Sequence, residues 1–308
     1  MVLIGTGFPV SGSFESDGPI SAIALYHILT YLGCQPIFVC APPISKTMAR
    51  GFLTYEMPIS DWKQSRAFVK KAVKALDPAL IVSVERPGVA ADGRYYNMHR
   101  DDITHLVAKY DLFFENGNCP RIAFGDGGNE IGMGNLQTRL TAMDIIPSVT
   151  VCDELVISSV SNWGVYGVIG VMSQLLNEDL FKLIDPESIA SFLMANGCVD
   201  GITHRPESTE DGFPLQVGIS IIRQIRKLIS AQKKKTEEEA IMSKIKVERK
   251  PTKERLEDLG VGEWPIWTKE SSEFPWSYDE SETCYFLEGD VVVTPEGQEP
   301  VEVGKGDL

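Results

Sequence analysis

Short apolar runs alternate with segments of helical periodicity along the first 230 residues of the chain. The apolar runs stand at residues 2–4, 36–40, 79–84, 121–124 and 154–158. A run without polar alternation, such as 79–84, is typical of a strand buried on both faces of a parallel sheet. Strand, loop and helix units that repeat over short links imply right-handed crossovers. The sequence therefore predicts an α/β fold, in which an open, mostly parallel sheet carries helices on both faces.

This fold predicts where a site would form. In an open parallel sheet, the loops that lead from strand to helix share the carboxyl edge, and ligands bind there at the switch in strand order. The loops 5–18, 85–101, 125–135 and 158–164 are therefore expected on one rim. They hold nearly all the unusual polar residues of the first two hundred.

The loop 125–135 is the most unusual of the four, because it packs five glycines and two carboxylates behind a strand. A strand does not tolerate so many glycines, so the chain must leave the sheet near Gly125. Backbone N–H groups then lie beside Asp126, Asn129 and Glu130. The two acids either cap the helix that follows or hold a hard cation such as Mg²⁺ or Mn²⁺. We take this loop as the centre of the candidate site.

The length and composition indicate one main domain and an appended segment. The chain has 308 residues, 43% of them hydrophobic. We expect an α/β domain over residues 1–243, with a charged helix or linker over 230–260. Residues 244–308 contain short β-type runs between prolines and glycines, and we expect a partial all-β module there. The runs expected as strands are 264–267, 273–276, 283–289, 291–295 and 302–307.

Charge and hydropathy limit the expected partners. The net charge of −14 argues against a nucleic acid or an anionic membrane surface as partner, unless the chain has a local basic patch. We expect no such patch, because the run 233–235 of lysines is followed at once by the glutamates 237–239. No apolar run approaches the roughly 18 residues of a membrane span. Six cysteines without CxxC spacing favour reduced thiols in a reducing compartment. We expect a soluble intracellular protein that acts on a small molecule, and a homo-oligomer remains open.

Common cofactor motifs are incomplete in this chain. The segment from Gly7 to Ser13 has the glycine spacing of a phosphate-binding loop but lacks its lysine. Neither Gly5-Thr6-Gly7 nor Gly125-Asp126-Gly127 has the third glycine of a dinucleotide fingerprint. The four histidines are too dispersed for a histidine-based metal cage. The one cofactor that we expect is a divalent cation, Mg²⁺ or Mn²⁺, on Asp126 and Glu130.

Several loop motifs together resemble the C-terminal domain of the D-glutamate cyclase family over roughly residues 1–230. These motifs are Thr6-Gly7-Phe8-Pro9, Glu15-Ser16-Asp17-Gly18-Pro19, Glu85-Arg86-Pro87-Gly88, Tyr95 with Asn97-Met98-His99, and Gly125 to Gly134. The resemblance implies a hydro-lyase that converts D-glutamate to 5-oxo-D-proline and water. It also implies a location in the mitochondrial matrix or another organelle, with the cytoplasm as the alternative.

The C-terminal segment resembles the first half of a cupin of the ureidoglycine-hydrolase-like group. The resemblance rests on Trp276 to Tyr278, Glu282, Glu288-Gly289 and Gly306-Asp307. Glu282 stands seven residues before Gly289, where cupins carry a metal-binding glutamate. Residues such as Trp276 and Tyr278 replace the two histidines expected upstream, so the resemblance does not extend to the metal ligands.

We assign roles from the chemistry of lactam formation, in which an amine attacks a carboxylate. Arg86, or a divalent cation on Asp126 and Glu130, would pair with a substrate carboxylate. Glu85 or His99 would transfer protons, and Asp17 would position the amine. The candidate catalytic residues are Glu85, Arg86, His99, Asp126 and Glu130. The candidate substrate-binding residues are Thr6, Gly7, Asp17, Asn97, Arg100, Gly127, Gly128 and Asn129, the glycine loop supplying N–H groups to a developing oxyanion.

Alternatives stay open at this point. Arg86 could form a structural salt bridge, and Asp17 could cap the helix that begins at Pro19. The whole domain could be a small-molecule binding protein without catalysis. It could also be a related lyase or hydrolase that acts on another carboxylate.

Overall fold

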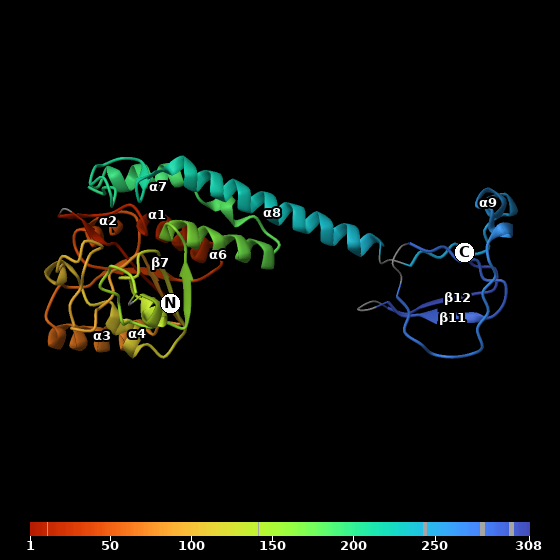
Figure 1. Ribbon diagram of the computed structural model, residues 1–308, viewed down its shortest axis with the longest axis horizontal. Helices are drawn as coiled ribbons and strands as arrows, with labels where there is room; N and C mark the ends of the chain where they lie inside the picture. Colours follow the sequence, from red (N-terminus) through yellow and green to blue (C-terminus); the bar gives the residue numbers. More distant parts are fainter. Residues whose placement is uncertain (11, 141, 243–244, 278–280, 296–298) are drawn as a thin grey trace. The chain divides into compact units, whose positions relative to one another are not determined.

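The first 229 residues fold around a six-stranded sheet with the order β5-β4-β1-β6-β7-β8, and every neighbouring pair is parallel (Figure 1). This confirms the predicted parallel sheet. The strands are β1 (Val2–Thr6), β4 (Pro36–Cys40), β5 (Thr54–Glu56), β6 (Leu80–Val84), β7 (Arg121–Gly125) and β8 (Glu154–Ile157). Two short hairpins lie outside the sheet, β2 (Pro9–Val10) with β3 (Ser13–Phe14) and β9 (Thr209–Glu210) with β10 (Phe213–Pro214).

The computed structural model describes residues 1–308 except 11, 141, 243–244, 278–280 and 296–298, and does not describe the side chains of 235–242. The chain divides into two compact units, Met1–Ile229 and Ser230–Leu308. The division falls inside a long helix, whereas the sequence pattern placed the boundary near residue 243. The helix is continuous because the charged segment after Ile229 keeps a high helix propensity.

Helices cover both faces of the sheet, as the sequence predicts. In Figure 1, α3 and α4 lie on one side of the sheet, and α1, α6 and α7 lie on the other. The helices of the first unit are α1 (Pro19–Tyr31), α2 (Ile44–Met48), α3 (Trp62–Leu76), α4 (Asp111–Asn116), α5 (Gln137–Leu140), α6 (Ser161–Leu175), α7 (Pro186–Met194) and the start of α8 (Leu215–Met242). Short 3-10 turns stand at Thr104–Leu106, Met133–Leu136 and Leu180–Leu183.

The core consists of two apolar layers, one on each face of the sheet. Side chains of a strand point alternately to its two faces. Ile4 of β1 therefore packs among the residues of α1 and α6, whereas its neighbour Leu3 packs with α3 and α4. Both side chains are fully buried. This double burial explains why the strands appear in the sequence as unbroken apolar runs.

The switch in strand order lies between β1 and β6. From β1 the chain first builds outward through β4 and β5, and then returns to add β6, β7 and β8 on the other side of β1. At such a switch the connections leave the two strands in opposite directions, and ligands of open α/β sheets bind there. Residues that follow β1, β6 and β7 meet at this place.

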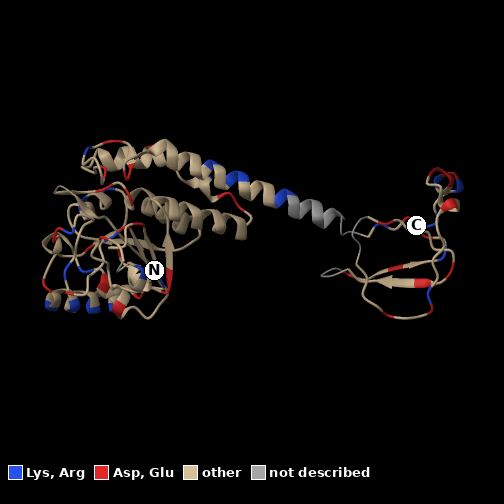
Figure 2. Ribbon diagram, in the orientation of Figure 1, with Lys and Arg blue, Asp and Glu red and all other residues tan. Residues whose placement is uncertain are grey.

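The surface of the first unit contains a local basic face. All five charged residues of α3 are basic and exposed, namely Lys63, Arg66, Lys70, Lys71 and Lys74 (Figure 2). The prediction that the chain has no local basic patch is therefore wrong, because other residues separate most of these in the sequence and they gather only on the helix surface. None of the helices that the structure describes has both the length and the apolar character of a membrane span. The six cysteines are free thiols, and Cys34 and Cys284 are exposed.

The second unit contains a helix and a β-hairpin. The helix is α9 (Lys253–Asp258), followed by a 3-10 turn at Val261–Glu263, and the hairpin joins β11 (Asp290–Val293) to β12 (Val301–Gly304). The expected strands at 264–267, 273–276 and 283–289 do not form. In the last of these runs, Phe286 exchanges backbone hydrogen bonds with Gly306 and Asp307, but this pairing does not extend into a ladder. Glu282 is exposed, and Tyr278 lies outside the described residues.

Candidate active site

Three carboxylates from three different loops meet at the switch in strand order. Asp17 follows β1, Glu85 follows β6 and Asp126 follows β7. One oxygen atom of each carboxylate lies within 4.8 Å of the others. Asp17 and Glu85 are only 2% and 5% exposed, and Asp126 is half-buried. We call Asp17, Glu85 and Asp126 the carboxylate cluster.

Asp17 is held by the start of helix α6. Its two carboxylate oxygens accept hydrogen bonds from the backbone N–H groups of Ser161 and Asn162, each at 2.8 Å. In return, Oδ1 of Asn162 accepts hydrogen bonds at 3.0 Å from the N–H groups of Gly18 and Ser21, at the start of α1. The alternative that Asp17 is the N-cap of the helix that begins at Pro19 is therefore wrong: the N-cap is Gly18, whose N–H donates to both Asp17 and Asn162.

Glu85 is fixed by a hydrogen bond and by an unusual backbone conformation. Oγ of Ser161 donates to its Oε2 at 2.5 Å. The φ angle of Glu85 is +43°, in the left-handed region that non-glycine residues rarely adopt. Gly18, with a φ of +87°, lies against it, and a Cβ at Gly18 would be 2.6 Å from Cβ of Glu85. The loops after β1 and β6 can approach this closely only because residue 18 has no side chain.

The glycine loop presents Asp126 and uses Glu130 for its own structure. The Glu130 carboxylate accepts hydrogen bonds from the N–H groups of Gly127 at 2.8 Å and Gly128 at 2.7 Å. These two N–H groups are thus engaged and do not face outward as donors for an oxyanion, contrary to the sequence hypothesis. Asn129 also braces the loop, since its Nδ2 donates to the carbonyl oxygen of Tyr96 at 2.9 Å.

The pKa values of the cluster are raised. Burial raises the pKa of Asp17 to about 7, against the backbone hydrogen bonds that lower it. Burial, and then the charges of Asp17 and Glu130, raise the pKa of Asp126 to about 10. The pKa of Glu85 is also well above its ordinary value, because of burial and then the charges of Asp126 and Glu130. The charged neighbours that raise these pKa values are all acids.

Arg86 lies next to Glu85 in sequence but points to the opposite face of the sheet. Its Nη1 and Nη2 donate to the carbonyl oxygens of Thr6 at 3.0 Å and Ala108 at 3.1 Å. The guanidinium lies 4.9 Å from the centre of the Tyr110 ring. Arg86 is buried and forms no salt bridge among the described residues. The sequence suggested that Arg86 pairs with a substrate carboxylate or forms a salt bridge. These contacts match neither suggestion.

The loop residues Asn97, His99 and Arg100 form contacts of their own. Oδ1 of Asn97 accepts hydrogen bonds from the N–H groups of His99 and Asp101, each at 2.9 Å. Arg100 forms an ion pair with Asp144. The His99 side chain is exposed and has no hydrogen bond to the residues that the structure describes. The structure does not bring these three side chains to the carboxylate cluster.

Thr6 and Gly7 lie at the end of β1, beside the cluster. Thr6 is fully buried, and its hydroxyl oxygen has no hydrogen-bond partner among the described residues. This oxygen is 3.0 Å from the position that a Cβ on Gly18 would take. Gly7 and Arg86 line a small separate cavity of about 20 Å³.

Sequence reasoning missed Ser161, Asn162 and Glu210. Glu210 is fully buried and accepts hydrogen bonds from Asn162, Trp163 and Tyr166. It thereby fixes the Asn162 amide that caps α1. The loop 158–164 was expected on the rim, so Ser161 and Asn162 could have been found there as polar residues at a helix start. Nothing in the sequence around Glu210 marks it as buried.

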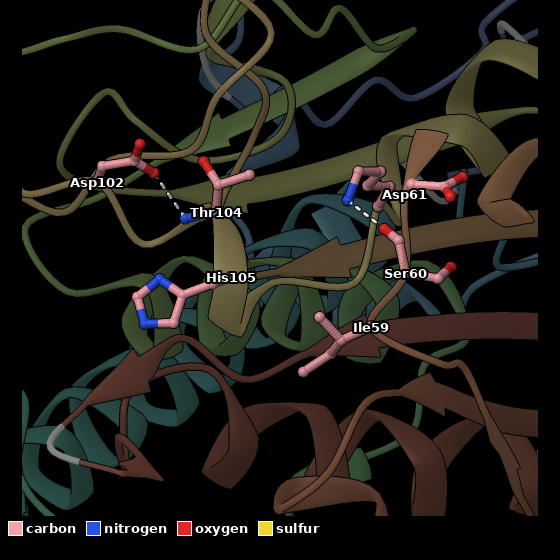
Figure 3. A pocket seen from close by; sticks show the side chains of 7 residues that line it. Ile59, Ser60, Asp61, Asp102, Thr104 and His105 are labelled. Atoms are coloured by element: carbon pink, nitrogen blue, oxygen red, sulfur yellow. Dashed lines mark hydrogen bonds between the residues drawn. The ribbon is translucent and has the colours of Figure 1, made fainter. Parts of the chain in front are cut away.

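A second hollow of about 470 Å³ lies away from the cluster. Figure 3 shows Asp102, Thr104 and His105 on one side of it and Ile59, Ser60 and Asp61 on the other. Lys109 also lines it, but its ammonium already donates to the carbonyl oxygen of Ser60 at 2.6 Å and lies 5.4 Å from the Trp62 ring. The Lys109 ammonium is therefore already bound, and Asp61 and Asp102 lie nearby. The lining of the hollow does not indicate a particular class of ligand.

Two solved structures resemble this chain only remotely. The apo form of a short chain oxidoreductase from Pseudomonas aeruginosa PAO1 is 14% identical, with 56% of this chain and 63% of that chain covered and a TM-score of 0.24. An actinorhodin polyketide ketoreductase variant with NADPH is 12% identical, with 74% and 89% covered and a TM-score of 0.25. Likenesses with these TM-scores support no conclusion.

Comparison with sequence families is more informative. The family model described as "D-glutamate cyclase-like, C-terminal" matches residues 1–226, and that of the "EutQ-like cupin domain" matches residues 256–308. The Homo sapiens protein named "D-glutamate cyclase, mitochondrial" is 33% identical over 194 residues, which cover 54% of this chain and 32% of that protein. The match thus spans about a third of the relative. Through residues 1–226, the chain belongs to the D-glutamate cyclase-like family.

Proposed function

We propose that this chain is a hydro-lyase that converts D-glutamate to 5-oxo-D-proline and water. Membership of the D-glutamate cyclase-like family supports a reaction of this class. The substrate is taken from the name of the human relative, of which the match covers 32%. The observation that carries the proposal is the buried carboxylate cluster at the switch in strand order, since ligands of open α/β sheets bind there.

The reaction sets two demands on a site. The amine nitrogen forms a bond to the γ-carbon, and a C–O bond of the γ-carboxylate breaks. The ammonium group gives up two protons in total, and the departing oxygen leaves with two protons as water. The site must therefore accept and return protons, and it must offset the charge of a carboxylate that would otherwise repel a nucleophile.

The carboxylate cluster can meet the first requirement, which is to accept and return protons. Carboxylates attract the ammonium group of a glutamate and can accept its protons. Asp126 is the member of the cluster that solvent reaches, while Asp17 and Glu85 are buried behind it. We assign the contact with substrate to Asp126. The rigid attachment of Asp17 and Glu85 to helix α6 keeps the cluster in one geometry, which favours an intramolecular attack.

The test is the formation of 5-oxoproline from D-glutamate and L-glutamate by the full chain. We expect turnover of the D-isomer, and we expect Asp126→Asn to lower it by at least about a hundredfold while the melting temperature stays the same or rises. Glu154→Gln is the matched control, because Glu154 is an exposed carboxylate at the opposite end of the sheet. Wild-type turnover in Asp126→Asn would remove Asp126 from the mechanism. Binding of D-glutamate without product would indicate a binding protein instead.

A further inference from the structure

We propose that Asp17, Glu85 and Asp126 together hold one divalent metal ion, Mg²⁺ or Mn²⁺, and that the Thr6 hydroxyl faces the same ion. The sequence hypothesis placed such an ion on Asp126 and Glu130. The structure points to a different set of ligands, drawn from the loops after β1, β6 and β7. The binding of the ion stands on geometry alone, whereas its part in catalysis rests on the proposed function.

The spacing of the oxygen atoms fits a single ion. The three carboxylates each offer an oxygen within 4.8 Å of the other two. Oxygen ligands lie roughly 2.0–2.1 Å from Mg²⁺, so two ligands of one ion are at most about 4.2 Å apart. The three carboxylates therefore lie near the spacing that one ion needs, and small side-chain shifts would complete the site.

A cation would allow all three carboxyl groups of the cluster to ionise together. Buried carboxylates are normally paired with a base or coordinate a metal, because an isolated buried charge is costly. The groups that act on Glu85 and Asp126 are the acids Asp17, Glu15 and Glu130, together with Asp211. Arg86, the nearest basic residue in sequence, donates to carbonyl oxygens on the other face of the sheet. A metal ion would supply the positive charge that these side chains do not.

The Thr6 hydroxyl is an independent observation that points to a ligand. It is fully buried and lacks a hydrogen-bond partner among the described residues. Such a group is costly unless something binds it. Its oxygen lies 3.0 Å from the Cβ position of Gly18, and that position is 2.6 Å from Cβ of Glu85. The hydroxyl therefore points to the place where the loops that carry Asp17 and Glu85 meet.

The donor atoms also select the kind of ion. The set contains carboxylate and hydroxyl oxygens and no histidine or cysteine, which favours Mg²⁺ or Mn²⁺ over zinc or copper. Glu130 is not available in the same way, because both its oxygens accept N–H groups of the glycine loop. In the proposed reaction, the ion would meet the second demand, since a positive charge beside the γ-carboxylate offsets the repulsion of the nucleophile.

The direct test is a titration of the full chain with Mn²⁺, after removal of other metals from protein and buffer. Electron paramagnetic resonance measures the Mn²⁺ that remains unbound at each step. We expect one ion per chain. We expect Asp126→Asn to weaken binding at least about tenfold, and Glu154→Gln to leave it unchanged. A folded wild-type protein that takes up no Mn²⁺ at millimolar concentration would overturn the proposal. Equal binding by wild type and Asp126→Asn would also overturn it.

Thr6→Val separates a ligand from a structural residue. Valine keeps the shape of threonine and removes only the hydroxyl, which forms no hydrogen bond in the structure. We expect unchanged or higher stability without metal and weaker Mn²⁺ binding by about threefold to tenfold. Unchanged Mn²⁺ affinity would remove Thr6 from the site.

Parallel assays of 5-oxoproline distinguish the metal site from the proposed reaction. Turnover that does not need metal would contradict only the role of the ion. Mn²⁺ binding without turnover would contradict only the reaction.

Discussion

Adjacent residues at the end of β6 have opposite surroundings. Glu85 turns toward α6, where Ser161 donates to it, and Arg86 turns toward Tyr110 and the loop before α4. This divergence follows from the alternation of side chains at the end of a strand. The arginine thus ties the ends of β1 and β6 to the loop at Ala108, and the glutamate belongs to the site.

A structural role for Arg86 predicts a change in stability and not in substrate affinity. Arg86→Met would leave the carbonyl oxygens of Thr6 and Ala108 without their donors, which should lower the free energy of unfolding by about 1–3 kcal/mol. Urea denaturation measures this loss. KM for D-glutamate should stay at the wild-type value. A raised KM in a variant of normal stability would instead place Arg86 in contact with substrate.

The buried carboxyl group of Glu210 predicts a pH dependence of stability. Burial raises its pKa from 4.5 to about 7, although Trp163, Tyr166 and Asn162 donate hydrogen bonds that lower it. The folded protein therefore binds this proton more tightly than the unfolded chain does. The stabilisation is fully present below the unfolded pKa and is lost as the pH rises through about 7.

Glu210→Gln should remove this dependence. Relative to the variant, the wild type should lose about 3 kcal/mol of unfolding free energy as the pH rises from about 5 to 8. Urea denaturation at several pH values gives the difference, and Glu154→Gln serves as the exposed control. Parallel curves for the wild type and Glu210→Gln would show that Glu210 does not change its protonation in this range.

Among the elements, helices α1 and α6 depend on each other at their first turns. Asp17 accepts the first N–H groups of α6, and Asn162 accepts those of Gly18 and Ser21 at α1. A helix leaves its first N–H groups without partners inside the helix, so a buried helix start needs such acceptors. The exchange joins the loops after β1 and β8 and sets the position of Asp17.

Loss of this exchange should destabilise the first unit markedly. Asn162→Ala removes the acceptor of the buried Ser21 N–H group, one of two acceptors of the Gly18 N–H group, and a donor to Glu210. We expect a loss of about 2–4 kcal/mol in unfolding free energy. Thr30→Ala is a suitable control, since it removes one exposed hydrogen bond within α1. If the two variants lost similar amounts of unfolding free energy, the caps would not contribute the stability proposed here.

The sequence predicts elements better than contacts between them. The apolar runs located all but one of the strands of the main sheet, because burial on both faces leaves a clear pattern; the short β5 gave no such signal. The rim was also predicted, since topology alone brings the loops after parallel strands to one edge. The partners of Asp17 and Glu130 were not predictable. Asp17 finds its donors 144 and 145 residues away, and Glu130 folds back onto its own loop.

At the scale of the whole molecule, the first unit should fold without the second. Its core is closed by α8, from which Ile222 is buried and Ile219, Ile225 and Ile229 pack partly. Within the described part of the second unit, several large apolar side chains are exposed, including Ile266, Trp267 and Trp276. A two-stranded hairpin and one short helix cannot bury enough apolar surface for independent stability.

A chain of residues 1–243 should therefore keep the Mn²⁺ affinity and the main thermal transition of the full chain. A chain that ends at residue 214 lacks all of α8 and should melt at least about 10 °C lower, because it loses the buried Leu215 and Ile222 and the partly buried isoleucines beside them. Differential scanning calorimetry of the three proteins measures this. Loss of the main transition in 1–243 would mean that the second unit contributes to the fold of the first.

The three acidic side chains at the switch in strand order lower the stability of the fold, although the proposed reaction needs them. Glu85 holds a backbone conformation that glycine would adopt more easily, and the acids around it raise each other's pKa values. Neutral replacements at these positions would relieve strain and repulsion in the metal-free protein. A screen for heat resistance alone would consequently enrich inactive variants. A screen that requires product would retain the costly arrangement, so the two selections should diverge first at residues 17, 85 and 126.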